Sequence, residues 1–193
     1  MDEAGVVPDF ASDVEVALAA AAAGARVVRE AYGGPVRRFA KSGSDFTTTA
    51  DLGAERAILD VIASARPDDD LLSEEAGGVL DGRPRRWLVD PLCGTVNFAA
   101  RTPLAAVNVA LVEGTRTLAC VSADPVADEV FWSDGGRTRR RWRSTDRPVQ
   151  PSAESGLIEV NCDGPPDTPF VGPQLLADPA FRSRFVARSC RRP

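Results

Sequence analysis

The sequence predicts an α+β fold, because two helical segments come first and a series of strands follows them. Residues 9–31 have apolar side chains at intervals of three and four, which place one apolar stripe along a helix. From residue 71 onward, short apolar runs alternate with glycine-containing turns, which is typical of strands in a sheet. With 193 residues, of which 44% are hydrophobic, the chain can bury a core without disulfides or a structural metal.

Two helices are expected in the first third of the chain. The apolar stripe of the first consists of Phe10, Val14, Leu18, Ala21, Ala25 and Val28. The glycines and proline at 33–35 end this helix, and residues 41–51 are polar and turn-like. The second helix covers residues 50–65. Thr48 and Asp51 have the spacing of a capping box at its start, and Pro67 follows its end.

Apolar runs predict five strands, at residues 71–72, 87–89, 105–112, 118–121 and 130–132. Residues 137–155 are rich in Arg, Ser and Pro, and we interpret them as a connector. Beyond it, residues 157–160 are predicted as the first strand of a new unit and residues 174–186 as a short helix. We therefore expect an α+β domain over residues 1–150 and the start of a C-terminal α/β domain over residues 151–193.

The charged residues exclude several kinds of function. The chain has a net charge of −5, which disfavours broad nucleic-acid binding, although residues 137–193 carry 11 arginines against 6 acidic residues. The run at 137–143 is interpreted as a solvated arm, with an anion-binding patch as the alternative. The chain has no histidine, which excludes His-based general bases and imidazole metal sites. Catalysis must then depend on carboxylates, hydroxyls, thiols, the single lysine Lys41, backbone amides or hard metal ions.

A cytoplasmic location without membrane contact is expected. No apolar run reaches the ~18 residues of a membrane-spanning helix, and the first residues lack the basic and apolar regions of a signal peptide. The four cysteines, at positions 93, 120, 162 and 190, form no CxxC pair, and we expect free thiols in a reducing compartment.

Acidic residues gather at three element boundaries: Asp45 with Asp51, then Glu74 with Glu75, then Asp90. The segment WLVDPLCGTVNF (87–98) is the most informative, because a buried strand would deliver a carboxylate at its end. The glycine of this segment allows close backbone approach, and amide N–H groups that follow it would cradle a phosphate. Each cluster alone is more often an ordinary turn or helix cap, but their joint order and spacing indicate a site.

At these residues the sequence resembles the inositol monophosphatase family of metal-dependent sugar phosphatases. The family pattern has a lysine, then D-x-x-T-x-x-D with a Glu four residues on, a G-E-E motif and W-x-x-D-P-x-D-G-T-x-N-F. The matching positions here are Lys41, DFTTTAD (45–51) with Glu55, SEE (73–75) and the 87–98 segment. The resemblance covers roughly residues 10–190. It implies a layered α/β sandwich of the sugar-phosphatase type, with helices on an antiparallel sheet and an incomplete second α/β unit.

The resemblance also implies a metal site. Glu74, Asp90 and the backbone carbonyl of Leu92 would hold one Mg²⁺, and Asp90 would bridge to a second Mg²⁺. Position 93, an aspartate in the family, would bind that second ion but is Cys93 here. Mg²⁺ prefers oxygen and binds sulfur poorly, so we expect the second site to be weakened.

Catalytic and phosphate-binding roles follow from the same resemblance. Asp45 and Thr95 would orient and activate the attacking water, and backbone amides around Gly94 and Thr95 would bind the phosphate. Lys41 and Asp51 would support the site. The family pattern continues past residue 193 with a W-D-x-x-A motif, whose aspartate completes the second metal site, so we expect an incomplete C-terminal unit.

The expected function is that of a Mg²⁺-dependent phosphomonoesterase acting on a small phosphorylated polyol, with inositol monophosphate as the default. Fructose 1,6-bisphosphate, histidinol phosphate and 3′-phosphoadenosine phosphates remain alternative substrates. A hypothesis of another class is a catalytically impaired remnant that binds phosphates. The expected partner is the small substrate, with no nucleic acid and no membrane, and the resemblance implies a homodimer.

Overall fold

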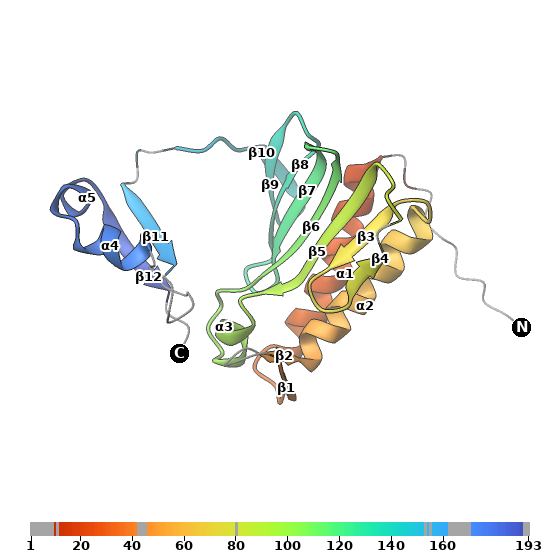
Figure 1. The fold of residues 1–193 in the computed structure, drawn as a ribbon, viewed down its shortest axis with the longest axis horizontal. Helices are drawn as coiled ribbons and strands as arrows, with labels where there is room; N and C mark the ends of the chain where they lie inside the picture. Colours follow the sequence, from red (N-terminus) through yellow and green to blue (C-terminus); the bar gives the residue numbers. More distant parts are fainter. Residues whose placement is uncertain are drawn as a thin grey trace, which may run out of the picture. The chain divides into compact units, whose positions relative to one another are not determined.

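A computed structural model describes residues 10, 12–41, 46–79, 81–152, 154, 156–161 and 171–190. The chain divides into two compact units, Met1–Val149 and Gln150–Pro193. In the first unit, two helices pack on one face of an eight-stranded sheet (Figure 1). The fold is α+β, as the order of the elements predicts. None of the described helices is both long and apolar enough to cross a membrane.

The first helix, α1 (Asp13–Ala31), begins at a capping box. The backbone N–H of Ser12 donates to Glu15 Oε2 at 2.9 Å, and the Ser12 hydroxyl accepts the amide of Glu15. This reciprocal pair satisfies two amides that no helical carbonyl can reach. The helix therefore starts four residues later than the apolar pattern predicts. Its buried face is mostly alanine and glycine, which lets neighbouring elements approach its backbone closely.

The second helix, α2 (Thr49–Ala65), begins at the capping box that the sequence predicts. Thr48 is the N-cap, and its backbone N–H donates to Asp51 Oδ2 at 2.9 Å. The helix buries Ala54, Ile58 and Ile62 against α1 and the sheet. The same face buries two carboxylates, Asp51 and Glu55, which apolar packing alone does not explain.

The large sheet has the strand order β10-β9-β8-β7-β6-β5-β3-β4. The strands are β3 (Asp70–Ser73), β4 (Gly77–Val79), β5 (Arg85–Cys93), β6 (Ala106–Glu113), β7 (Arg116–Asp124), β8 (Glu129–Ser133), β9 (Thr138–Trp142) and β10 (Thr145–Pro148). All neighbouring strands are antiparallel except β3 and β5, which are parallel. The expected antiparallel sheet is thus a mixed one.

Alternate residues of the central strands form the core between the sheet and the helices. Trp87 and Val89 of β5 are buried on that face, as are Val107 and Val109 of β6. The indole of Trp87 is fully buried, and its Nε1 donates to Asp69 Oδ2 at 2.9 Å. The intervening residues of the same strands project from the opposite face, which α1 and α2 do not cover.

The interpretation of residues 137–155 as a connector is wrong for residues 138–148. These residues form β9 and β10, which extend the sheet as an antiparallel hairpin. Composition hid these strands because arginine is an uncommon strand residue. Here Arg139 and Arg141 each place a guanidinium 5.9 Å from the ring centroid of Trp132, so their aliphatic stems cover apolar surface in the sheet.

Three short elements lie near the start of α2. Strands β1 (Arg38–Ala40) and β2 (Phe46–Thr48) pair antiparallel, and β2 lies within residues 41–51, which were expected to be turn-like. Helix α3 (Thr95–Ala99) begins directly after β5. Gly94 and Thr95, whose amides the sequence analysis expects to cradle a phosphate, lie at this helix start.

The second unit contains β11 (Leu157–Asn161), α4 (Val171–Ala177), α5 (Pro179–Arg184) and β12 (Val186–Cys190). The predicted single helix at 174–186 is two helices, because the side chain of Asp178 caps a new start by accepting the amide of Ala180 at 2.7 Å. A second strand follows that the sequence did not predict, and β11 and β12 pair in parallel.

The crossing of α1 over α2 and the sheet depends on Gly24. A Cβ atom there would lie 2.6 Å from Ile58 Cδ1 and 3.2 Å from Val107 Cγ1. We expect Gly24→Ala to lower the free energy of unfolding by about 1–3 kcal/mol, because both neighbours are buried and cannot yield. Urea unfolding followed by circular dichroism measures this change.

Gly53→Ala in α2 is the matched control. Its Cβ atom would lie 3.1 Å from Val27 Cγ1, a side chain that is only half buried and can move. The usual helix gain of about 0.4–1 kcal/mol should offset that contact. An equal gain in stability at both positions would contradict the close packing at Gly24.

Candidate metal- and phosphate-binding site

The candidate site lies where β5 ends and α3 begins. The pairing of β5 with β6 is regular as far as Asp90 and Asn108 and resumes only at Cys93, so the strand is irregular between them. Gly94 then has φ +91°, and a Cβ atom there would lie 2.6 Å from the carbonyl oxygen of Leu104. Only glycine fits this turn without strain. The turn exposes the first amides of α3.

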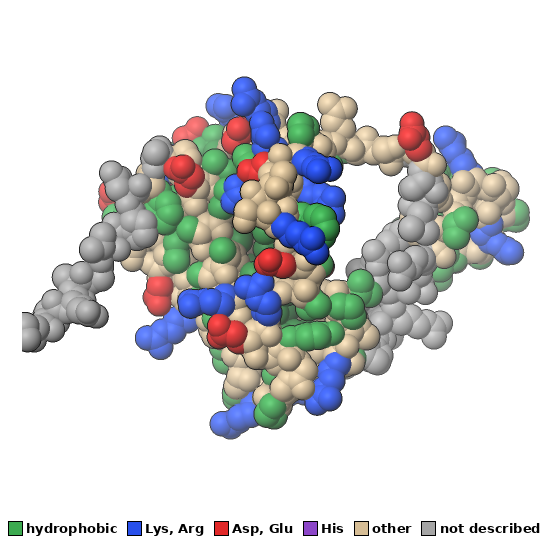
Figure 2. Space-filling model, turned by 180° about the vertical axis from the view of Figure 1, so that it is seen from behind, with side chains coloured by type: hydrophobic (Ala, Val, Ile, Leu, Met, Phe, Trp, Pro, Cys, Tyr) green, Lys and Arg blue, Asp and Glu red, His purple; other side chains and the backbone are tan. Residues whose placement is uncertain are grey.

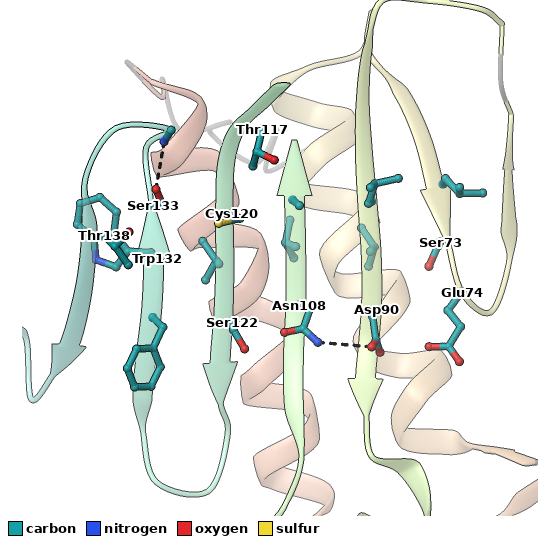
Figure 3. Close-up of a pocket in the computed structure, with 18 residues that line it drawn as sticks. Ser73, Glu74, Asp90, Asn108, Thr117, Cys120, Ser122, Trp132, Ser133 and Thr138 are labelled. Atoms are coloured by element: carbon teal, nitrogen blue, oxygen red, sulfur yellow. Dashed lines mark hydrogen bonds between the residues drawn. The ribbon is translucent and has the colours of Figure 1, made fainter. Parts of the chain in front are cut away.

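The parallel pairing of β3 and β5 brings two carboxylates together. Ser73 pairs with Val89, and the amide of Glu74 donates to the Val89 carbonyl at 3.0 Å. Glu74 directly follows the end of β3 and therefore lies beside Asp90 of β5. Figure 3 shows both side chains on the open face of the sheet, with Asn108 beside Asp90. They line a cavity of about 900 Å³ on that face.

Asp90 holds a carboxylate oxygen without a partner. Its Oδ2 atom accepts a long hydrogen bond of 3.4 Å from Asn108 Nδ2. Its Oδ1 atom is buried and has no hydrogen-bond partner. A buried carboxylate oxygen in this state requires a donor or a cation. Asn108 was not identified from the sequence, although it is a polar residue inside the apolar run 105–112.

The electrostatics of the site disfavour further negative charge. Burial, and then the charge of Asp90, raise the pKa of Glu74. Burial, followed by the charges of Asp90 and Glu74, raises the pKa of Cys93 to about 11. The thiol of Cys93 is therefore protonated at neutral pH. A divalent cation beside Asp90 and Glu74 would relieve the repulsion between these two carboxylates.

A second group of polar side chains connects α2 to the start of α3. The Thr95 hydroxyl donates to Asp51 Oδ1 at 2.8 Å and lies 3.1 Å from the Leu92 carbonyl oxygen. Asp51 is 1% exposed, and burial raises its pKa despite the hydrogen bonds that it accepts. Asp51, the partner of Thr48 in the capping box of α2, thus also contacts the candidate site. Asp45, the other carboxylate expected here, lies outside the described residues.

Lys41 distinguishes the two adjacent glutamates. Its Nζ atom lies 2.7 Å from Glu75 Oε1 and 3.7 Å from Glu74 Oε1. The Glu75 side chain is 4% exposed, whereas the Glu74 side chain is 53% exposed. Glu75 is therefore neutralised in a buried ion pair, and Glu74 remains accessible beside Asp90.

Glu55 fixes the loop that carries both glutamates. Its Oε1 atom accepts hydrogen bonds from the Ser73 hydroxyl and, at 2.8 Å, from the amide of Ala76. The loop is thereby attached to α2 at both ends. The sequence shows Glu55 only as part of a motif, and the structure shows what it holds.

The donor atoms present fit a hard divalent cation. Over the described ranges, no three His, Cys, Asp or Glu side chains converge into a metal cluster. The candidate donors are the carboxylates of Glu74 and Asp90, of which Asp90 Oδ1 is buried without a partner, and the carbonyl of Leu92, two residues after Asp90. Oxygen donors of this kind suit Mg²⁺, which keeps several waters, better than they suit softer metals. Cys93 adds only a protonated thiol.

Comparison with known proteins identifies relatives of this chain. A model of the inositol monophosphatase family matches residues 10–166. An inositol-1-monophosphatase of Caulobacter vibrioides is 39% identical over 100 residues, which are 50% of this chain and 39% of that protein. A fructose-1,6-bisphosphatase/inositol-1-monophosphatase of Aquifex aeolicus is 34% identical over 125 residues, covering 64% of this chain and 47% of that protein. The chain spans about half, or less, of the length of these curated relatives.

Two solved structures have a similar fold. The crystal structure of extragenic suppressor protein suhB from Bartonella henselae superposes with a TM-score of 0.78 and 27% identity, covering 91% of this chain and 69% of that one. An inositol monophosphatase from Thermotoga maritima superposes with a TM-score of 0.72 and 22% identity, covering 92% and 66%, and shows the shared fold alone.

The raised pKa of Cys93 is measurable by alkylation. In metal-free protein we expect iodoacetamide to modify Cys93 at pH 8 roughly tenfold more slowly than it modifies N-acetylcysteine, because the thiolate is scarce. The rate should rise until about pH 11. Peptide mapping by mass spectrometry separates Cys93 from the other cysteines. Asp90→Asn should move the midpoint to lower pH, and a midpoint near the ordinary ~8.5 in the unsubstituted protein would contradict this electrostatic description.

Proposed function

The chain belongs to the inositol monophosphatase family, and we propose that it is a Mg²⁺-dependent phosphomonoesterase acting on a small phosphorylated polyol. The observation that carries the proposal is the partnerless buried oxygen of Asp90, next to the accessible carboxylate of Glu74. Such a pair is unfavourable in the protein alone and becomes favourable once a cation is bound.

In this proposal Glu74, Asp90 and the Leu92 carbonyl hold the metal. Bound Mg²⁺ would supply positive charge for the phosphate and would lower the pKa of a coordinated water. The protein positions the ligands: the pairing of β3 with β5 places the two carboxylates, and Glu55 of α2 holds the loop that carries Glu74. Phosphoryl transfer depends mainly on such positioning and on charge neutralisation.

Thr95 and Asp51 orient the attacking water in this proposal. The Thr95 hydroxyl donates its hydrogen to Asp51 at 2.8 Å, which leaves the Thr95 oxygen able to accept a proton from water. The pKa of Asp51 is raised by burial, so its carboxylate is a better proton acceptor than an exposed one. We therefore propose Asp51 for this role beside Asp45, which is expected from the sequence to share it and lies outside the described residues.

The backbone at the start of α3 binds the phosphate. The first amides of a helix have no carbonyl partner within the helix, and Gly94 leaves room for an anion to approach them. Thr95 therefore contributes its amide to the phosphate and its hydroxyl to the water. The relatives named above favour inositol monophosphate or a fructose bisphosphate as substrate.

A second candidate function rests on Cys93. A protonated thiol replaces the hard oxygen that the family has at this position, so a second Mg²⁺ would be held weakly. This substitution is consistent with a protein that binds phosphate and one metal ion but hydrolyses its substrate slowly. The two candidates differ in turnover and agree in metal binding.

Turnover tests the proposal directly. We expect the protein to hydrolyse inositol 1-phosphate or p-nitrophenyl phosphate with Mg²⁺ and to lose activity in EDTA. Asp90→Asn should lower kcat/KM by roughly 100-fold or more, because it removes charge from the metal site. Asp60→Asn, on the exposed surface of α2, is the control and should change nothing. Activity that survives both EDTA and Asp90→Asn would refute the phosphatase, whereas metal binding without turnover favours the second candidate.

The two glutamates give a separate test of the metal site. We expect Glu74→Gln to weaken Mg²⁺ binding by about tenfold, because each charged ligand contributes at least ~1.4 kcal/mol. Calorimetry with the metal-free protein measures this affinity. Glu75→Gln should weaken binding much less, since Glu75 pairs with Lys41 and is not a metal ligand in this proposal.

Stability should respond in the opposite order. Glu75→Gln breaks a buried ion pair and should destabilise the protein. The raised pKa of Glu74 means that its carboxyl favours the folded state when protonated, and this contribution is lost as the pH rises. Glu74→Gln should therefore not reduce stability at pH 7 without metal. If both variants lose Mg²⁺ affinity equally, the roles of the two glutamates are assigned wrongly.

A further inference from the structure

The β9–β10 hairpin carries a concave basic site at the edge of the sheet, far from the carboxylates. Its cavity of about 230 Å³ is lined by Arg140, Trp142, Arg143, Thr145 and Arg147, and contains no acidic side chain. We call these five residues the arginine cradle. Figure 2, the view from behind, shows Lys and Arg side chains gathering in the upper part of this unit, next to hydrophobic ones.

The register of the hairpin sets these side chains on one face. Arg140 pairs with Arg147, and Trp142 pairs with Thr145. Residues directly opposite each other in antiparallel strands project to the same side, and like charges in that position are destabilising. The hairpin therefore places two guanidiniums side by side, and Glu129 of β8 compensates only that of Arg140. A bound anion between them would remove the repulsion.

The indole of Trp142 orders the guanidiniums. The Cζ atom of Arg143 lies 4.4 Å from the ring centroid, and that of Arg140 lies 5.8 Å from it. Cation–π contacts of this kind restrict the arginine side chains before any ligand arrives. Less conformational entropy is then lost when an anion binds.

The turn retains Arg143 at a position where arginine is unfavourable. Arg143 has φ +48° and Ser144 has φ +61°, so both central residues of the two-residue turn are left-handed. Asn-Gly is the usual choice for such a turn, and other residues pay a conformational penalty there. A ligand-binding role of the Arg143 guanidinium in the arginine cradle would explain why arginine is kept at this unfavourable position.

The charge left in the cradle specifies the ligand. Arg140 forms an ion pair with Glu129, whereas no ion pair of Arg143 or Arg147 occurs among the described residues. About two positive charges therefore face the cavity. Its small volume and the arginines stacked on Trp142 leave no open platform for a row of bases, and the net charge of −5 disfavours a long polyanion.

We propose that the arginine cradle binds a diphosphate group, either free or carried by a small molecule. Paired guanidiniums bind phosphate oxygens through two parallel hydrogen bonds, and Thr145 adds a hydroxyl donor. The site is separate from the candidate metal site. Arg140 lies four strand spacings from Asp90, or ~19 Å. The register across the sheet runs from Asp90 through Asn108, Ser122 and Phe131 to Arg140. The proposal does not depend on the proposed phosphatase activity.

Calorimetry with sodium pyrophosphate tests it, in EDTA so that no metal binds at Asp90. We expect Arg147→Gln and Arg143→Asn each to weaken pyrophosphate binding by about tenfold, because each removes a charged hydrogen-bond donor. Arg56→Gln removes the same charge from the exposed surface of α2 and should leave the affinity unchanged. Adenosine diphosphate in a parallel titration distinguishes a free diphosphate from one carried by a nucleoside.

Thermal unfolding makes the test specific. Arg143→Asn puts a favoured residue into the left-handed turn position and should raise the Tm while it lowers the affinity. A substitution that merely damaged the hairpin would lower both. Pyrophosphate that does not bind, or that binds equally to all four proteins, overturns the proposal. A single-stranded RNA 12-mer that binds more tightly than either diphosphate, with loss in Arg143→Asn, overturns the choice of a compact ligand.

Discussion

The parallel pairing of β3 with β5 is the constraint on which the candidate site depends. It is the single parallel pair among the described strands of the large sheet, and it places the end of β3 beside Val89 and Asp90 within β5. Glu74 and Asp90 therefore meet, although 16 positions separate them in the chain. Their mutual repulsion, together with the partnerless oxygen of Asp90, makes this edge of the sheet a place for a cation.

The helix layer does more than cover the core. Asp51 caps α2 and accepts the hydroxyl of Thr95, and Glu55, one turn later, holds the loop of Glu74. Both carboxylates are buried, a position that is unfavourable without hydrogen bonds. One helix end thus fixes two different parts of the site. At Gly24, α1 packs closely against both Ile58 of α2 and Val107 of the sheet.

The two charged regions of the sheet use opposite chemistry on one scaffold. Acidic side chains gather where β3 and β5 end, and arginines gather on the β9–β10 hairpin. In both regions like charges face each other without full compensation from the protein. A folded chain keeps such arrangements where a ligand of opposite charge completes them.

The sequence by itself determined the α+β class, the two helices and the capping box at Thr48, because these follow from local periodicity and caps; its candidate site residues came from contiguous motifs that resemble a known family. Only the tertiary structure decided that β3 and β5 are parallel, that Asn108 contacts Asp90, and that Lys41 lies closer to Glu75 than to Glu74. The same holds for the two strands of the arginine-rich segment. Each of these features depends on strand register or on contacts between residues far apart in the chain. Local sequence patterns indicate neither the register nor such contacts.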